Sequence, residues 1–207
     1  MPVKAFTLRQ AMSAQANGLK GWADFDYLLD AMHKDRGATF KHRLNWDVEV
    51  DEFGWEIDKF DDWKVNPLYL ISVDDDGEYR GSLRLLPTTG PNMLADVFPQ
   101  LLDDSPPESA TIWESSRITS ADDTFAELVV AIGEVAQQAG VTQVVTVVDE
   151  RIKRLLRIVK CPAEVIGTPQ PIGGIMCYAL SISDPELLET RERCGLPGPV
   201  LEGMVQL

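Results

Sequence analysis

The chain has 207 residues, of which 44% are hydrophobic and 25% are charged, so we expect a single globular domain over residues 1–207. Its formal net charge of -14 argues against nucleic acid or an anionic membrane as the main partner, because both are bound by basic faces. An anionic ligand would need a local basic patch.

The start of the chain and the cysteines indicate a reducing compartment. No run of 18 apolar residues occurs, and the first ten residues are too polar for a signal-peptide core, so we expect a cytoplasmic protein. Cys161, Cys177 and Cys194 are odd in number and widely spaced, and only two histidines accompany them. We therefore expect reduced thiols, at least two of them packed, and no metal site.

The first third of the chain predicts a helix followed by a long loop. After an N-terminal lead (1–20), apolar side chains recur at spacings of three and four over 22–42, which predicts a helix with one apolar face. Arg36 interrupts that face, and it either reaches water or pairs with an internal carboxylate. Residues 43–66 are rich in aromatic and acidic side chains, a composition often found in a binding lid.

The remaining segments alternate apolar runs with turn signals. Ser120 is the expected N-cap of a helix that has Asp122 and Asp123 in its first turn and ends at Gly140. We expect strands at 68–73, 78–86, 111–120, 141–148, 163–166 and 175–182, helices at 93–102, 121–139, 150–160 and after Pro185, loops at 103–107 and 167–174, and a loosely held tail at 195–207. This order predicts an α/β (α+β) fold, a mixed central β-sheet flanked by helices on both faces.

The strand at 111–120 contains two charged residues in an apolar, hydroxyl-rich setting. Glu114 and Arg117 are three apart, so a regular strand would put them on opposite faces unless a bulge redirects one of them. An ordinary edge strand with two solvated charges fits this segment taken alone.

Three arginines in semi-buried contexts can be matched by three carboxylates. A balanced set of charges beside an aromatic loop favours a preorganised polar pocket, and a purely structural salt-bridge network also fits. The arginines are Arg36, Arg84 and Arg117, and the carboxylates are Asp58, Asp61 and Glu114.

Five blocks of residues carry a resemblance to a known family. At these spacings the chain resembles the LuxI-type acyl-homoserine lactone synthases over residues 24–180, and several blocks in the right order are more specific than any one of them. The blocks are Arg36-x-x-x-Phe40-x5-Trp46, Glu56-Ile57-Asp58-x-x-Asp61, Arg84-Leu85-Leu86-x-Thr88-Thr89-Gly90-Pro91, Phe98-Pro99 and Trp113-Glu114-x-Ser116-Arg117.

This resemblance implies an acyltransferase fold similar to that of the GNAT N-acetyltransferases. Members of the family transfer an acyl group from an acyl carrier protein, or in some cases from coenzyme A, to the amine of S-adenosylmethionine. Ring closure then releases methylthioadenosine and a lactone, the signal of bacterial quorum sensing. Both reactants are substrates, and the resemblance implies no cofactor.

The resemblance also implies where the site lies. Thr146 lies on the strand that lines the family's acyl pocket, and we add Phe98 and Ser116 to that pocket. Two departures are a longer N-terminal lead and Val148 in place of a frequent second hydroxyl, which bears on acyl preference. The family's other characteristic positions are Arg36, Phe40, Trp46, Asp58, Asp61, Arg84, Glu114 and Arg117.

These residue types fit the substrate's chemistry. Phe40 and Trp46 can offer aromatic faces to the sulfonium cation, while Asp58 and Asp61 supply negative potential, with Arg36 among the binding residues. These five are the expected S-adenosylmethionine site.

The acylation step needs a base and a site for the oxyanion. The substrate's ammonium must lose a proton before it attacks, and Glu114 is the candidate base, acting through a water. Arg117 and Arg84 would hold Glu114 in orientation. A backbone N–H where the sheet is splayed or bulged would meet the oxyanion, and lactonisation needs mainly positioning.

The segment 150–160 is the one dense basic cluster of an acidic chain. We expect the anionic acyl donor to dock there and its arm to enter beside the Thr146 strand, although a solvated helix explains the same charges. The basic residues are Arg151, Lys153, Arg154, Arg157 and Lys160.

Two other functions compete with this one. An amine N-acetyltransferase using acetyl-CoA usually carries Arg/Gln-x-x-Gly-x-Gly/Ala, and the nearest stretch, 137–142, lacks the last small residue. A non-catalytic ligand- or carrier-binding module could keep the fold, but the intact charge set disfavours it.

Overall fold

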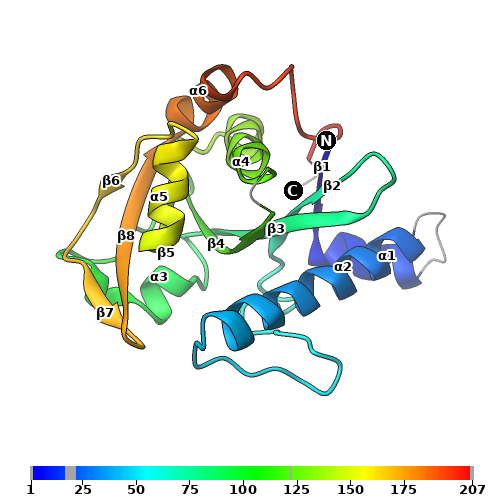
Figure 1. Cartoon of the computed structure of the whole chain (residues 1–207), viewed down its shortest axis with the longest axis horizontal. Helices are drawn as coiled ribbons and strands as arrows, with labels where there is room; N and C mark the ends of the chain where they lie inside the picture. The colour runs from blue at the N-terminus through cyan, green and yellow to red at the C-terminus, as the bar shows by residue number, and fades with distance from the viewer. Residues whose placement is uncertain (1, 17–21, 122, 206–207) are drawn as a thin grey trace.

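A single eight-stranded sheet forms the centre of the computed structural model, in which residues 2–16, 22–121 and 123–205 are described. The strands are β1 (Val3–Thr7), β2 (Leu68–Val73), β3 (Tyr79–Pro87), β4 (Ile112–Ser120), β5 (Gln143–Asp149), β6 (Glu164–Val165), β7 (Gln170–Ile172) and β8 (Ile175–Ser183). Their order is β1-β2-β3-β4-β5-β8-β6, with β7 also paired to β8 (Figure 1). Neighbouring strands are antiparallel except β4 and β5, which are parallel.

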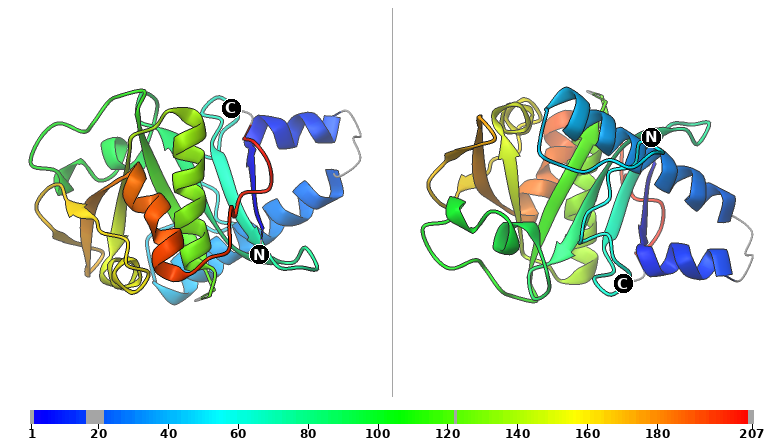
Figure 2. Two further views of the ribbon diagram at one scale, coloured as in Figure 1. Left: turned by 90° about the horizontal axis from the view of Figure 1, so that it is seen from above. Right: turned by 90° about the horizontal axis from the view of Figure 1, so that it is seen from below.

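Helices cover both faces of this sheet (Figures 1 and 2). They are α1 (Leu8–Ala16), α2 (Trp22–Arg36) with a π-helical continuation (Gly37–Arg43), α3 (Met93–Asp96), a 3-10 turn (Pro99–Leu101), α4 (Phe125–Ala139), α5 (Glu150–Ile158) and α6 (Asp184–Cys194). Helices α4, α5 and α6 lie on one side, and α1, α2 and α3 lie on the other. The expected mixed sheet between helices is confirmed. None of the described helices has the length and apolar character needed to span a membrane.

Alternation along the strands creates a separate core on each face. Leu68 and Leu70 of β2 pack into the main core with α4. The residue between them, Tyr69, packs on the other face with Leu28 and Met32 of α2. A strand that is buried on both faces reads as one continuous apolar run, as residues 68–73 do.

Helix α4 begins later than the sequence predicts. Thr124 is its N-cap residue, while the expected cap, Ser120, is the last residue of β4 and pairs with Gly81. The prediction was wrong because pairing in the sheet continues through Ser120. Of the two acidic residues expected in the first turn, Asp123 precedes the helix and Asp122 lies outside the described residues. Gly140 ends the helix with φ of 68°, as predicted.

Segments near both ends of the described chain are hydrogen-bonded to the rest of the fold. Residues 3–7 of the N-terminal lead form β1, an edge strand paired with β2. The tail was expected to be loosely held, and this is wrong for Val200 and Leu201, whose N–H groups donate to buried Glu134 of α4 at 3.0 and 2.8 Å. Glu134 also pairs with Arg191, and Val3 N–H donates to the Val200 carbonyl at 2.7 Å. A buried carboxylate therefore holds the tail against β1.

The loop at 43–66 is fastened to α2. A Cβ atom on Gly37 would lie 2.4 Å from the Gly54 carbonyl oxygen, so only glycine allows this approach. Farther along, Glu56 N–H donates to the His33 carbonyl at 3.1 Å, and His33 Nδ1 lies 3.0 Å from the Glu56 carbonyl. These contacts place the acidic end of the loop against the last turns of α2.

Two short segments differ from their predictions. The 93–102 segment divides into α3 and a 3-10 turn that starts at Pro99, which lacks the N–H needed to continue a helix. The expected loop at 167–174 contains β7. A Cβ atom on Gly167 would lie 2.0 Å from the Leu101 carbonyl oxygen, so glycine lets this segment close over the 3-10 turn.

The three cysteines are free thiols. Cys161 and Cys177 are buried, and Cys194 is exposed, which confirms that at least two are packed. Burial raises the pKa of the Cys161 and Cys177 thiols, so both stay protonated at neutral pH.

Candidate active site

Three guanidinium groups and three carboxylates meet between α2, the 43–66 loop and the sheet. The predicted charge balance holds, but the third carboxylate is Glu56, and the prediction that Glu114 would take this place was wrong. We call this set the ion-pair cluster, and it consists of Arg36, Arg84, Arg117, Glu56, Asp58 and Asp61.

Arg36 binds two carboxylates inside the protein. Its Nε donates to Glu56 Oε2 at 2.6 Å, and Nη1 and Nη2 donate to the two oxygens of Asp61 at 3.1 and 2.7 Å. Asp61 also accepts from the Tyr69 hydroxyl at 2.8 Å. Burial alone would raise the pKa of Asp61, but the Arg36 and Arg84 guanidiniums outweigh burial and hold that pKa well below its ordinary value. Arg36 therefore pairs internally instead of reaching water.

Arg84 and Arg117 share Asp58. The two terminal nitrogens of Arg84 donate to the two oxygens of Asp58 at 2.6 and 2.9 Å, and Arg117 Nη2 lies 3.1 Å from Asp58 Oδ2. The Asp58 side chain is 16% exposed, whereas those of Glu56 and Asp61 are 2% exposed. Asp58 is therefore the carboxylate of the ion-pair cluster that a ligand can reach.

A β-bulge in β4 directs Arg117 into the ion-pair cluster. The pairing of β3 with β4 shifts by one residue between Ser82 and Arg84. Arg117 has φ of 55°, in the left-handed region that residues other than glycine rarely adopt. Glu114 and Arg117 are three residues apart, so a regular strand would put them on opposite faces. The bulge lets Arg117 reach the face on which Glu114 lies.

Glu114 is buried against the first turn of α3. Its two oxygens accept from the N–H groups of Met93 and Leu94 at 2.8 and 2.6 Å. Burial raises the pKa of Glu114 to about 7, although these two N–H groups oppose the rise. A carboxylate has about four acceptor sites, so two remain. In the described part of the chain, Glu114 is oriented by α3. The prediction that Arg84 and Arg117 would orient it was wrong, because Arg84 donates to Asp58 and Arg117 donates to Glu56.

A stacked pair of aromatic rings lies beside Arg117. Phe40 and Trp46 stack with their centroids 5.1 Å apart and a 22° angle between planes. The Arg117 guanidinium carbon lies 5.2 Å from the Phe40 centroid. Phe40 is buried and already contacts a cation, whereas Trp46 is half-buried. Trp46 is thus the ring with surface left for a cationic ligand.

Strands β4 and β5 separate beside the ion-pair cluster. They pair only from Ile112 and Gln143 to Ser115 and Thr146, although both strands continue beyond that point. Past the last pair, no pairing joins the two strands in the residues that the structure describes. A backbone N–H at such an opening is the group predicted to meet an oxyanion.

The predicted acyl-pocket residues lie on two faces of the sheet. Ser116 is two residues from Glu114, so both face α3. Phe98 packs beside α3 in the same apolar cluster as Val145 of β5. Thr146 follows Val145, so its side chain faces α4 and α5 instead. The structure therefore brings Phe98 and Ser116 to one face and leaves Thr146 at the end of the strand opening on the other.

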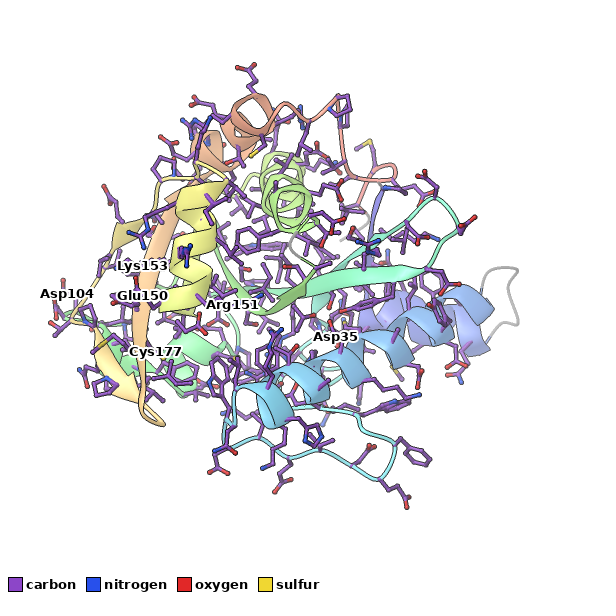
Figure 3. All side chains as sticks on the ribbon, in the orientation of Figure 1. Asp35, Asp104, Glu150, Arg151, Lys153 and Cys177 are labelled. Carbon is purple, nitrogen blue, oxygen red and sulfur yellow. The ribbon has the colours of Figure 1, made fainter. Side chains whose placement is uncertain are left out.

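The basic residues of α5 are spread over the length of the helix. Figure 3 shows Arg151 on the side of α5 that faces β4, and Lys153 Nζ lies 3.6 Å from the centroid of the Tyr178 ring on β8. Arg157 is about 9 Å farther along the helix than Arg151, at 1.5 Å per residue, and Lys160 lies two residues beyond Ile158, where the helix ends. The structure therefore separates the predicted docking residues into two groups. The far group borders an open depression of about 560 Å³, lined by Arg157, Lys160, Cys161, Pro162 and Arg193.

Sequence reasoning missed three residues that support the site. Glu56 begins the block Glu56-Ile57-Asp58-x-x-Asp61, so its place in that motif could have identified it. Tyr69 lies in an apolar run, where a hydroxyl group that binds Asp61 looks like an ordinary core aromatic. His33 contacts the loop through backbone groups, and no sequence signal identifies such contacts.

Comparisons with known proteins show what this chain is similar to. A protein-family model described as "Autoinducer synthase" matches residues 25–188. A curated "Probable acyl-homoserine-lactone synthase" from Sinorhizobium fredii is 36% identical over 167 residues, covering 73% of this chain and 78% of that protein.

Solved structures show the same similarity. LasI, an AHL synthase, is 32% identical with a TM-score of 0.70, covering 86% of this chain and 91% of that chain. TofI in a ternary complex with an inhibitor and MTA is 30% identical with a TM-score of 0.73, covering 81% and 90%. These likenesses extend over more than four fifths of this chain.

Proposed function

The chain belongs to the autoinducer synthase family, and from that premise we propose that it acylates the amine of S-adenosylmethionine and closes the lactone with release of methylthioadenosine. Curated relatives of this family are acyl-homoserine-lactone synthases, and the fold is GNAT-like. One observation carries the residue assignment. A buried carboxylate with a pKa of about 7, Glu114, lies on the same sheet face as a charge-balanced cluster in which Asp58 is accessible.

Acylation begins with a proton transfer to Glu114. An α-amino group has a pKa of about 7.7 to 8.0, so a base with a pKa near 7 is well matched to it. A water in one of the two unused acceptor positions of Glu114 can carry the proton. The free amine then attacks the thioester carbonyl, and an N–H on the open strand edge stabilises the oxyanion. The bond between carbonyl carbon and sulfur breaks, and the extra proton on the attacking nitrogen passes to the departing thiolate. Lactonisation follows when the carboxylate attacks the carbon next to sulfur and the C–S bond breaks, which neutralises both charges.

The sulfonium end of the substrate is assigned to Trp46 and Asp58. The ion-pair cluster is neutral overall, so its effect on a cation depends on which member is exposed. Asp58 has the exposed edge, and Trp46 has the open ring face. Arg36 and Asp61 have a supporting role, because they hold Asp58 and the 43–66 loop in place.

Replacing Asp58 tests this assignment. Asp58→Asn removes the accessible negative charge, and we expect S-adenosylmethionine affinity to fall by roughly 10-fold or more, since a charge-assisted contact contributes about 1.5 to 3 kcal/mol. Isothermal calorimetry measures the affinity, with a melting curve to establish folding. Asp62→Asn removes the same charge from an exposed position outside the ion-pair cluster and should leave affinity unchanged. Unaltered affinity in a folded Asp58→Asn variant would make the cluster purely structural.

The acyl donor is proposed to approach along α5. The donor is a thioester of acyl carrier protein or coenzyme A, and both are anionic, whereas the protein has a net charge of -14. Arg151 and Arg154 lie in the first half of α5, nearer the strand opening than Lys160 does.

Reversing one charge on α5 should change the kinetics for the acyl donor and leave those for S-adenosylmethionine unchanged. Arg154→Glu should raise the apparent KM for the donor several-fold, and less at high salt, because exposed charges act through screened, long-range attraction. Lys160→Glu makes the same charge change beyond the C-terminal end of α5 and should have a smaller effect. Steady-state kinetics at two ionic strengths, with acyl-CoA and acyl carrier protein in parallel, measure both. Equal effects of the two variants would contradict docking near the opening.

Product analysis tests the function itself. Purified protein is incubated with S-adenosylmethionine and an acyl donor, and mass spectrometry follows the lactone and methylthioadenosine. An amine N-acetyltransferase would form an acylated amine without methylthioadenosine, and a binding module would form neither. The same method applied to organic extracts of an expressing culture identifies the acyl group.

A further inference from the structure

A second polar cluster joins α2 to the bulge in β4. At its centre is the Tyr79 hydroxyl, 2.9 Å from Asp35 Oδ2, 3.0 Å from Ser82 Oγ and 2.9 Å from Thr119 Oγ1. Ser82 and Thr119 are buried, and Figure 3 shows Asp35 on the side of α2 that faces the sheet. We call these four residues the Tyr79 cluster. None of them belongs to the ion-pair cluster.

The hydrogen bonds of the Tyr79 cluster have defined directions. A carboxylate only accepts, so the Tyr79 O–H donates to Asp35. The phenol oxygen can then accept from the hydroxyls of Ser82 and Thr119, which uses its full capacity of one donor and two acceptor sites. Burial and the nearby Asp35 charge raise the pKa of Tyr79, so the phenol keeps its proton. Removing the hydroxyl would leave three polar groups, of which Ser82 and Thr119 are buried, without their shared partner.

The Tyr79 cluster lies at the edge of the bulge. Ser82 and Thr119 form the last β3–β4 pair before the register shifts, and the next pair is Arg84 with Ser116. Arg117, with its left-handed backbone, lies in the shifted segment between these pairs. A conformation of this kind persists only where the surroundings determine it. The Tyr79 cluster supplies hydrogen bonds on one side of that segment.

The same cluster lies next to the arginine on α2. Asp35 directly precedes Arg36, whose Nε donates to one oxygen of Glu56 at 2.6 Å, while Arg117 Nη2 donates to the other at 2.8 Å. Two arginines from different elements therefore reach one carboxylate. Their spacing depends on the distance between α2 and the bulge, which the bond between Tyr79 and Asp35 spans.

We infer that Tyr79 is a positioning residue for the S-adenosylmethionine site. By holding α2 against the edge of the bulge, it sets where Arg36 and Arg117 meet Glu56, and where Arg117 lies over Phe40. This inference rests on the proposed function, because it assigns the Phe40 and Trp46 side of the ion-pair cluster to the sulfonium substrate. A merely structural hydroxyl would affect folding without distinguishing one substrate from the other.

Tyr79→Phe separates positioning from stability. We expect the KM for S-adenosylmethionine to rise roughly 10-fold, which corresponds to about 1.4 kcal/mol, while the donor KM and kcat at saturating S-adenosylmethionine change less than about twofold. Thr119→Val should shift the same parameter in the same direction, and Thr119→Ser, which keeps the hydroxyl, should restore it. Tyr27→Phe is the matched control, because the exposed Tyr27 hydroxyl donates to Glu78 and accepts from the Tyr79 backbone N–H, and its loss leaves the Tyr79 hydroxyl in place.

The outcomes distinguish the possibilities. A lower melting temperature with an unchanged KM would make Tyr79 structural only, and equal changes in the KM values of both substrates would indicate a general disturbance; either result overturns the inference. If wild-type protein forms no lactone, the proposed function fails. In that case, calorimetric binding of S-adenosylmethionine to wild-type, Tyr79→Phe and Tyr27→Phe proteins still tests positioning: weaker binding by Tyr79→Phe alone supports it, and equal binding by all three overturns it.

Discussion

Glu114→Gln is expected to reduce acyl transfer by roughly 10²- to 10⁴-fold, the usual range for the loss of a general base. The carboxylate is buried and held by two N–H groups of α3, with acceptor positions left for a water. Glutamine cannot take up the proton. Binding of S-adenosylmethionine should be retained, because the ion-pair cluster does not include Glu114. Single-turnover acylation measured beside calorimetry separates the two effects.

This substitution also disturbs α3, and a control must account for that. A glutamine side chain puts an N–H₂ group opposite the N–H of Met93 or Leu94, which costs about 1 to 3 kcal/mol of unfolding free energy. Asn92→Ala removes the side chain that caps Ala95 N–H at 3.0 Å, so it weakens the same helix and keeps the base. If Asn92→Ala lost as much activity as Glu114→Gln, displacement of α3 would explain the loss and the base assignment would be wrong.

The pKa of Glu114 predicts how rate and stability vary with pH. Because that pKa is about 7, kcat/KM should rise with pH up to about 7 through ionisation of Glu114, and this dependence should disappear in Glu114→Gln. The folded pKa lies above the ordinary value of 4.5, so the folded state binds the proton more tightly than the unfolded state. Glu114 therefore lowers the free energy of unfolding as pH rises from about 4.5 to 7. Denaturation of the wild-type protein and of Glu114→Gln between pH 4.5 and about 7 measures this change in the free energy of unfolding.

Asp61→Asn should cost about 3 to 5 kcal/mol of unfolding free energy, the range for removing one partner of a buried ion pair. Asp61 is bound by Arg36, Arg84 and the Tyr69 hydroxyl. An asparagine would leave both buried guanidiniums short of one negative charge, and its N–H₂ group would face other donors. This is the largest stability effect that we expect at the site.

Urea denaturation at pH 7 tests this expectation, with Asp62→Asn as the exposed control from the same loop. The pKa of Asp61 lies well below its ordinary value of 3.8, so its stabilisation is complete above that pH and is lost as pH falls through the lower, folded value. In Asp61→Asn this acid-dependent component should be missing. A loss below about 1 kcal/mol, as is usual for exposed ion pairs, would show that the ion-pair cluster is solvated or readily rearranged.

Local patterns in the sequence were enough to predict most of the helices and strands and the candidate site residues. Gly140 ends α4 because a left-handed residue is needed there, and the apolar run at 68–73 forms a strand buried on both faces. The motif blocks selected Arg36, Arg84 and Arg117 as members of one charged site. These features depend on residues close together in the chain, so spacing and side-chain type reveal them.

Tertiary structure decided which groups meet. Glu56, and not the expected Glu114, belongs to the ion-pair cluster because the 43–66 loop contacts α2 at Gly37. Glu114 instead accepts from the N–H groups of α3. Arg117 joins that cluster only because the bulge changes the register, and Thr146 faces away because alternation along β5 puts it there. Each outcome depends on pairing and packing between segments distant in the chain, and a single sequence carries no local signal for which partner a charged side chain takes.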